Sequence, residues 1–225
     1  MTAEHAWVDL LRAQTDRFAA AIDRRDLEAP VAHCPGWTVR DLAVHLGGVH
    51  QWAAHAVVEG NPNLVPTAPD GESVAYWYGR HASRLIEVLS ERPADTPAWT
   101  LDRDNPTAGF WRRRQVHETV MHTWDAEHAV GEAAAIDPAL AWDGVLEVSD
   151  ILYPRQLRLG RIAPLDRAVR LVATDVPDAV VRLGEGETVE VRHTAEVLLR
   201  LLWHRAAADE AAPDEIAVLA GAVTP

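Results

Sequence analysis

Hydrophobic residues recur every three or four positions in several long segments of the first 130 residues. This spacing is typical of helices that bury one face. It predicts helices over about residues 3–25, 39–58, 73–91 and 110–130. Polar loops rich in proline separate these segments. The pattern therefore predicts an up-and-down four-helix bundle.

The second and fourth of these helices have recognisable ends. Thr38 and Asp41 have the Thr-x-x-acid spacing of a capping box, so the second helix should begin near Val39. Gly131 should end the fourth helix, because glycine readily takes the left-handed conformation that terminates helices.

The later part of the chain combines helical and strand patterns. Asp137 and Pro138 should start a fifth helix, which ends near Pro154. Short valine-rich runs then predict a small antiparallel sheet with strands over residues 168–173, 179–183 and 188–192. A helix over residues 194–204 should follow, and residues 213–225 should form a strand or a frayed tail.

The change from helical to strand patterns falls at about residues 155–165. It predicts a helical domain over residues 1–160 and a small α+β domain over residues 161–225. The fold class is therefore mainly α.

Composition limits the possible partners. The net charge is −13, with 21 Lys and Arg against 34 Asp and Glu, so the surface repels nucleic acid and anionic lipid. Cys34 is the only cysteine, and no apolar run is long enough to span a membrane. The amino terminus lacks the pattern of a signal sequence. We expect a cytoplasmic protein with no nucleic-acid or membrane partner.

Residues 113–125 hold the strongest candidate chemistry. Glu118 and His122 are four positions apart, which places them about 40° apart around a helix, so both can face one metal ion. His117 and His122 are five apart and do not share a face, which excludes the zinc-protease motif. His45 lies one turn inside the second helix and could supply a third ligand.

Two further side chains on the fourth helix are candidate catalytic residues. Arg114, one of three consecutive arginines, could hold a carboxylate of a substrate or of a thiol. Asp125 follows His122 by three positions, so its carboxylate could accept a proton from the imidazole and fix its tautomer.

Two blocks of sequence resemble a known family. One runs from Cys34 through Pro-Gly-Trp-Thr to His45 and Leu46, and the other runs from Arg114 through Glu118 and His122 to Ala126. Together they resemble the mycothiol-dependent maleylpyruvate isomerase family of the DinB-like superfamily. The resemblance implies a metal-binding helical bundle followed by a small domain similar to sterol carrier proteins.

The resemblance also implies the chemistry. His45, Glu118 and His122 would hold a divalent metal, preferably zinc, and mycothiol would act as a thiol cofactor or co-substrate. The activity would be isomerisation of a small electrophile such as maleylpyruvate, or transfer of the thiol to it. Arg205, in a late helix, would be a further catalytic residue, although this chain has His204 where the family usually has a small residue before that arginine.

Other readings of the residues remain open. Iron or nickel also suits two His and one carboxylate. A metal hydrolase would use bound water and no thiol. A non-catalytic binding or regulatory protein would close the site with a fourth ligand, such as His50 or His117. The sequence leaves open the electrophile, and whether the protein is a monomer or a homodimer.

Overall fold

The computed structural model describes residues 3–23, 26–206 and 210–219. The chain divides into two compact units, residues 1–134 and 135–225. The predicted fold class is confirmed, because the described elements are mainly helices with one small sheet towards the carboxyl end. None of the described helices is long and apolar enough to cross a membrane.

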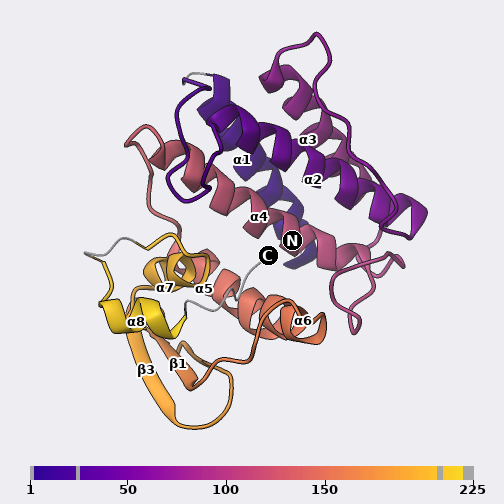
Figure 1. The fold of residues 1–225 in the computed structure, drawn as a ribbon. Coiled ribbons are helices and arrows are strands. Elements are labelled where there is room, and N and C mark those ends of the chain that lie inside the picture. The colour runs from indigo at the N-terminus through magenta and orange to yellow at the C-terminus, as the bar shows by residue number, and fades with distance from the viewer. Residues whose placement is uncertain (1–2, 24–25, 207–209, 220–225) are drawn as a thin grey trace. The chain divides into compact units, whose positions relative to one another are not determined.

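Long helices form the described part of the first unit (Figure 1). They are α1 (Ala3–Asp23), α2 (Val39–Glu59), α3 (Val74–Glu91) and α4 (Ala108–His128). All four predicted helices are thus confirmed. The predicted end of the first helix at residue 25 lies outside the described residues. Gly131 follows α4 with a φ of 73°, as predicted for its terminating residue.

The contacts between the helices define their positions around the bundle. Both α1 and α2 pack mainly against α3 and α4. Few contacts join α1 to α2, or α3 to α4, although each pair is consecutive in the chain. Their connections are long enough to cross an end of the bundle, so these consecutive helices take diagonal positions. This arrangement places α2 beside α4, the helix that carries Glu118 and His122.

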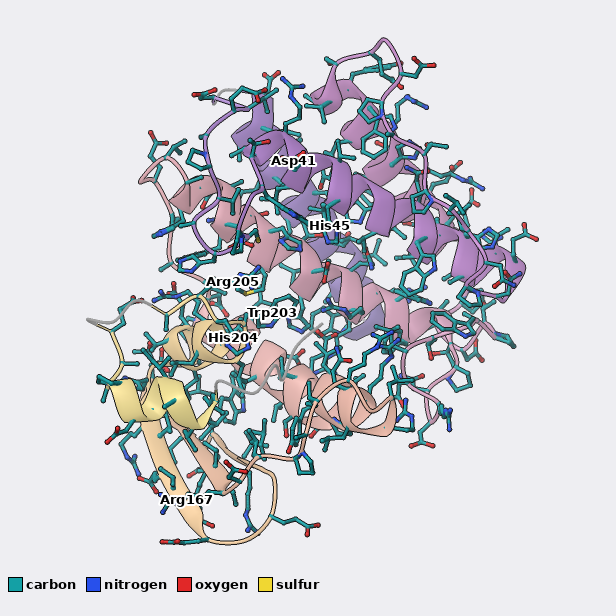
Figure 2. All side chains as sticks on the ribbon, viewed as in Figure 1. Asp41, His45, Arg167, Trp203, His204 and Arg205 are labelled. Carbon is teal, nitrogen blue, oxygen red and sulfur yellow. The ribbon has the colours of Figure 1, made fainter. Side chains whose placement is uncertain are left out.

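The start of α2 is fixed by the predicted capping box. Thr38 Oγ1 accepts a hydrogen bond from the Asp41 N–H (3.3 Å), and the Asp41 carboxylate accepts one from the Thr38 N–H (2.8 Å). These hydrogen bonds hold the pKa of the Asp41 carboxyl below its ordinary value. The cap also sets the position of His45, which lies about one turn further along the same helix (Figure 2).

A shared apolar core joins α2 to α3. Trp77 and Tyr78 of α3 are fully buried with Phe18 of α1 and Leu42 of α2. Gly47 lets the two helices approach, because a Cβ at this position would overlap Trp77 Cζ3 and lie 2.8 Å from Cη2. The contact therefore requires glycine at position 47.

The second unit begins with a helical segment in three parts. They are α5 (Pro138–Glu147), a π-helical turn (Val148–Leu152) and α6 (Tyr153–Arg158). Its predicted start is confirmed, because the Asp137 side chain accepts a hydrogen bond from the Leu140 N–H (3.0 Å). The helical segment does not end near Pro154. This proline lies in the first turn of α6, after the π-helical turn, and there the missing N–H removes no hydrogen bond of the helix.

The predicted strands are confirmed as β1 (Ala168–Ala173), β2 (Val180–Leu183) and β3 (Thr188–His193), but the sheet is mixed. In the order β2-β1-β3, β1 is antiparallel to β2 and parallel to β3. The turn after β2 crosses the start of β1, where the Ala168 N–H donates to Glu187 O (2.9 Å). Gly184 makes this crossing possible with a φ of 72°. The prediction of an antiparallel sheet was therefore wrong for β3, which pairs with β1 in parallel.

The remaining helices explain two further differences. Since α5 packs against α7 (Ala195–Leu202), it belongs to the second unit, and the units divide after residue 134 rather than at the predicted residue 160. The helix α8 (Pro213–Val218) replaces the predicted strand or frayed tail. Its Glu215 carboxylate accepts the Ala212 N–H (2.8 Å), which caps the helix. Residues 220–225 lie outside the described residues.

We predict that Gly47→Ala lowers the free energy of unfolding by about 1–3 kcal/mol, because the added methyl group forces Trp77 out of its position. Gly79→Ala is the matched control on α3, where a Cβ meets nothing within 4 Å, and it should raise stability by about 0.5–1 kcal/mol. Urea unfolding of both variants measures the difference. Equal stabilities would contradict the close approach of α2 and α3.

Candidate metal centre

The helix α4 carries polar side chains into the interior of the first unit. Arg114, Glu118, His122 and Asp125 are each less than a tenth exposed. A buried charge is costly unless hydrogen bonds or ions satisfy it, so these groups must be paired with one another or with a ligand. Glu118 Oε1 lies 3.3 Å from His122 Nε2, which confirms that the two side chains share one face of the helix.

The third side chain comes from α2. His45 Nε2 lies 3.5 Å from Glu118 Oε1, and the ring centroids of His45 and His122 are 5.1 Å apart. One ligand atom from each of the three residues lies within 4.8 Å of the others. The His45 side chain is 36% exposed, so the cluster reaches the surface of the first unit at this residue.

Two neighbouring groups orient these side chains. His122 Nδ1 lies 3.1 Å from Asp125 Oδ2, so an Nδ1 proton donates to the carboxylate and the Nε2 lone pair faces Glu118. The Arg114 guanidinium donates to Glu118 Oε2, which leaves Oε1 directed at the two imidazoles. The structure thus brings the sequence candidates Arg114 and Asp125 next to the three candidate ligands.

The three side chains fit a divalent metal. In tetrahedral coordination with bonds of about 2.05 Å, ligand atoms are about 3.3 Å apart. The two distances to Glu118 Oε1, 3.3 Å and 3.5 Å, are close to this value. A carboxylate oxygen and two neutral imidazole nitrogens are all acceptors, so their convergence favours a cation between them. Two His and one carboxylate suit zinc, iron or nickel.

His50 and His117 do not supply a fourth ligand. His50 is completely buried, and its ring nitrogens face Gln115 Oε1 (2.8 Å) and the Tyr78 hydroxyl (3.4 Å). His117 packs edge-on against Trp7, with ring centroids 5.7 Å apart. Within the described ranges, the group of possible metal ligands is limited to His45, Glu118 and His122.

A sequence model of one family matches most of the first unit. It describes the mycothiol maleylpyruvate isomerase N-terminal domain and matches residues 8–127, more than half of the chain. The chain belongs to this family. The match confirms the resemblance seen in the sequence, and it contains His45, Glu118 and His122 but ends before Arg205.

Solved structures related to this isomerase family share the fold. A crystal structure of a mycothiol-dependent maleylpyruvate isomerase is 16% identical, with a TM-score of 0.64 over 94% of this chain and 95% of that chain. A histidine-to-alanine mutant of such an enzyme is 15% identical, with a TM-score of 0.61 over 89% and 91% of the chains. No curated protein matches the sequence. At these identities the likeness shows the fold alone.

Arg205, the catalytic candidate taken from the family, belongs to the second unit. It follows α7, and its Nη1 donates to the Trp203 carbonyl while its guanidinium lies 5.4 Å from the centroid of the Trp203 ring (Figure 2). His204, the residue before it, has a φ of 58°, a conformation that favours glycine. The catalytic role of Arg205 stays a prediction.

Sequence reasoning missed a groove beside His45. It has a volume of about 350 Å³ and lies between α2 and the connection to α3. Its lining includes Val44, His45, Val49, Trp52, Pro66 and Thr67. The apolar residues of α2 in this set have the same periodicity as core residues, and the loop has no periodicity, so no sequence signal indicated that they line a groove.

The buried His50 predicts a pH dependence of stability. Burial lowers its pKa from 6.5 to about 4, although the hydrogen bond with Gln115 opposes the shift. Between these pH values the unfolded chain binds a proton that the folded protein does not, so the free energy of unfolding falls as the pH falls. From pH 7 to pH 5 this one group should cost about 2 kcal/mol.

Urea unfolding of metal-free protein at pH 7 and pH 5 tests this. In His50→Phe the loss between the two pH values should be about 2 kcal/mol smaller than in the wild type. His55→Phe, on the same helix, is the control and should keep the wild-type loss. An unchanged pH dependence in His50→Phe would contradict a neutral, buried His50.

Proposed function

We propose that this protein is a metal-dependent enzyme that uses mycothiol to act on a small electrophile, either as a cis-trans isomerase or as a thiol S-transferase. The observation that carries the proposal is the convergence of His45, Glu118 and His122, each of which offers one ligand atom within 4.8 Å of the others. Membership of the isomerase family supports the use of a thiol.

Each residue has a distinct role in the proposed site. His45 Nε2, Glu118 Oε1 and His122 Nε2 hold the metal, with zinc as the preferred ion. Arg114 and Asp125 are positioning residues, because the first contacts Glu118 Oε2 and the second contacts His122 Nδ1. When bound, the metal lowers the pKa of a coordinated thiol, so that a nucleophilic thiolate is available at neutral pH.

Three protein ligands distinguish this site from a structural zinc site. A structural zinc ion normally has four protein ligands, whereas a catalytic one has three and a position for an exogenous ligand. His50 and His117, the two side chains that could have closed the site, make contacts elsewhere. This arrangement favours an enzyme over a metal-stabilised regulatory protein.

The isomerase and the transferase differ in the fate of the thiol adduct. In both, the sulfur forms a bond to one carbon of an activated double bond. The π electron pair of the double bond then moves onto the conjugated carbonyl group. Isomerisation follows if the former double bond rotates and the thiol is expelled again. Transfer follows if the other carbon gains a proton and the adduct is released. The solved structures with this fold are named as isomerases, which makes isomerisation of maleylpyruvate the first reaction to test.

Metal content is the first prediction. Purified wild-type protein should hold about one equivalent of zinc, and both His45→Ala and His122→Ala should lose it, because two remaining ligands bind a metal weakly. His55→Ala, a half-buried histidine on α2 that contacts Asn61, is the control and should keep the metal. Mass spectrometry of the metal measures all four proteins. A wild type that stays metal-free after reloading would contradict the site.

Asp125 supplies a second prediction. Asp125→Asn should weaken zinc affinity about 10–100-fold, because the imidazole of His122 loses the carboxylate that fixes its tautomer. Asp95→Asn, at an exposed residue of the same unit, makes the same change of charge and should leave the affinity unchanged. Competition with a chelator measures the affinities. Equal affinities for both variants would show that Asp125 has no positioning role.

The thiol requirement is tested by mass balance. With mycothiol and a small electrophile that carries an activated double bond, such as maleylpyruvate or an uncharged ester of it, the wild type should accelerate loss of the substrate, and His122→Ala should not. A constant thiol concentration would identify an isomerase, and a fall equal to the substrate lost would identify a transferase. Equal rates with and without thiol would contradict the proposal and would instead support a metal hydrolase.

A further inference from the structure

The groove beside His45 has a lining unlike that of a site for charged ligands. Its walls are formed by Val44, Val49 and Trp52 of α2 and by Pro66 of the following connection. The described residues that line it include no Lys, Arg, Asp or Glu. Its polar groups are those of Thr67 and of His45, which is also a candidate metal ligand. A ligand in this groove would therefore lie beside the metal centre, against an apolar surface.

Hydrogen bonds hold the groove in shape. Gln51 Oε1 accepts from both the N–H and the hydroxyl of Thr67 (3.0 Å each), and Gln51 Nε2 donates to Thr67 O (3.2 Å). Trp52 Nε1 donates to Pro62 O (3.0 Å). Gly48 lets the connection approach α2, because a Cβ there would lie 3.3 Å from Pro66 Cβ. A ligand therefore meets a preformed groove and need not order the loop first.

The charge of the lining selects among ligands. A carboxylate moved from water to an apolar surface pays a large desolvation cost unless a cation pairs with it. In the candidate metal centre the guanidinium of Arg114 contacts Glu118. A hydroxyl-rich thiol would also leave hydroxyl groups without partners in such a groove. An uncharged apolar group instead gains from burial against Val49 and Trp52.

We propose that this groove binds the apolar part of an uncharged electrophile, and that the protein discriminates against dianionic substrates. The inference rests on the proposed function, because it assigns the substrate class of the same metal site. The volume of about 350 Å³ is within the range of small-molecule sites, which is about 300–1,000 Å³. The substrate would be an uncharged ester, ketone or amide that carries an activated double bond, and Val49 and Trp52 would determine its specificity.

Binding of unreactive analogues tests the groove without any turnover. Diethyl succinate and succinate share one carbon skeleton, differ in charge and lack the double bond. Isothermal titration of the full-length protein with each ligand is carried out as purified and again with EDTA, so that direct binding of succinate to a metal is excluded. The variants are Val49→Lys and Val49→Ala, and the control is Val58→Lys, which makes the same change at an exposed valine of α2.

We expect the wild type with EDTA to bind the ester about tenfold more tightly than succinate. Val49→Ala should weaken ester binding about threefold to tenfold, because it removes apolar contact area. Val49→Lys should reverse the preference, because its ammonium group can pair with a carboxylate. Val58→Lys should behave as the wild type.

Equal binding of both ligands by the wild type, tighter binding of succinate, or unchanged ester binding in both Val49 variants would overturn the proposal. Ester binding that persists with EDTA separates this inference from the proposed function. A protein without a functional metal site can still show the preference for the ester. A functional thiol-dependent enzyme can equally lack it.

Discussion

The first unit depends on one buried carboxylate. Glu118 lies on a helix that is buried on almost every side, where an unpaired charge would be strongly destabilising. Arg114 satisfies one of its oxygens, and the other faces the imidazoles of His45 and His122. Because three acceptor atoms meet at this point, a cation there satisfies all of them at once. The arrangement that lowers the cost of burying Glu118 is therefore also the candidate metal site.

Local patterns in the sequence predicted much of this site. Residues four positions apart lie on one face of any helix, so the spacing of Glu118 and His122 was enough to predict that they are neighbours. The capping box at Thr38 fixes where α2 begins and hence where His45 lies along it. Which helices become neighbours depends on how the long connections cross the bundle, and no local pattern records this. Three other features also join segments that are distant in the sequence, so local patterns could not predict them. They are the parallel pairing of β3, the packing of α5 on α7 and the groove beside His45.

The family relationship and the local geometry answer different questions. Family membership establishes which fold the first unit has, and structures only 16% identical in sequence still share that fold. The reaction depends on a few side chains and on what surrounds them. In this chain one of the three candidate ligands, His45, lines a groove without lysine or arginine in its described lining, so the proposed metal chemistry would be combined with a surface suited to uncharged molecules.

X-ray absorption spectroscopy of the zinc-loaded protein, before and after addition of mycothiol, tests the central claim most directly. Without thiol, the spectrum should show only nitrogen and oxygen neighbours at about 2.0–2.2 Å, two of them with the scattering pattern of imidazole. Addition of thiol should introduce one sulfur neighbour at about 2.3 Å. A coordination shell that mycothiol leaves unchanged would show that the metal does not bind the thiol, and it would contradict the account of the site given above.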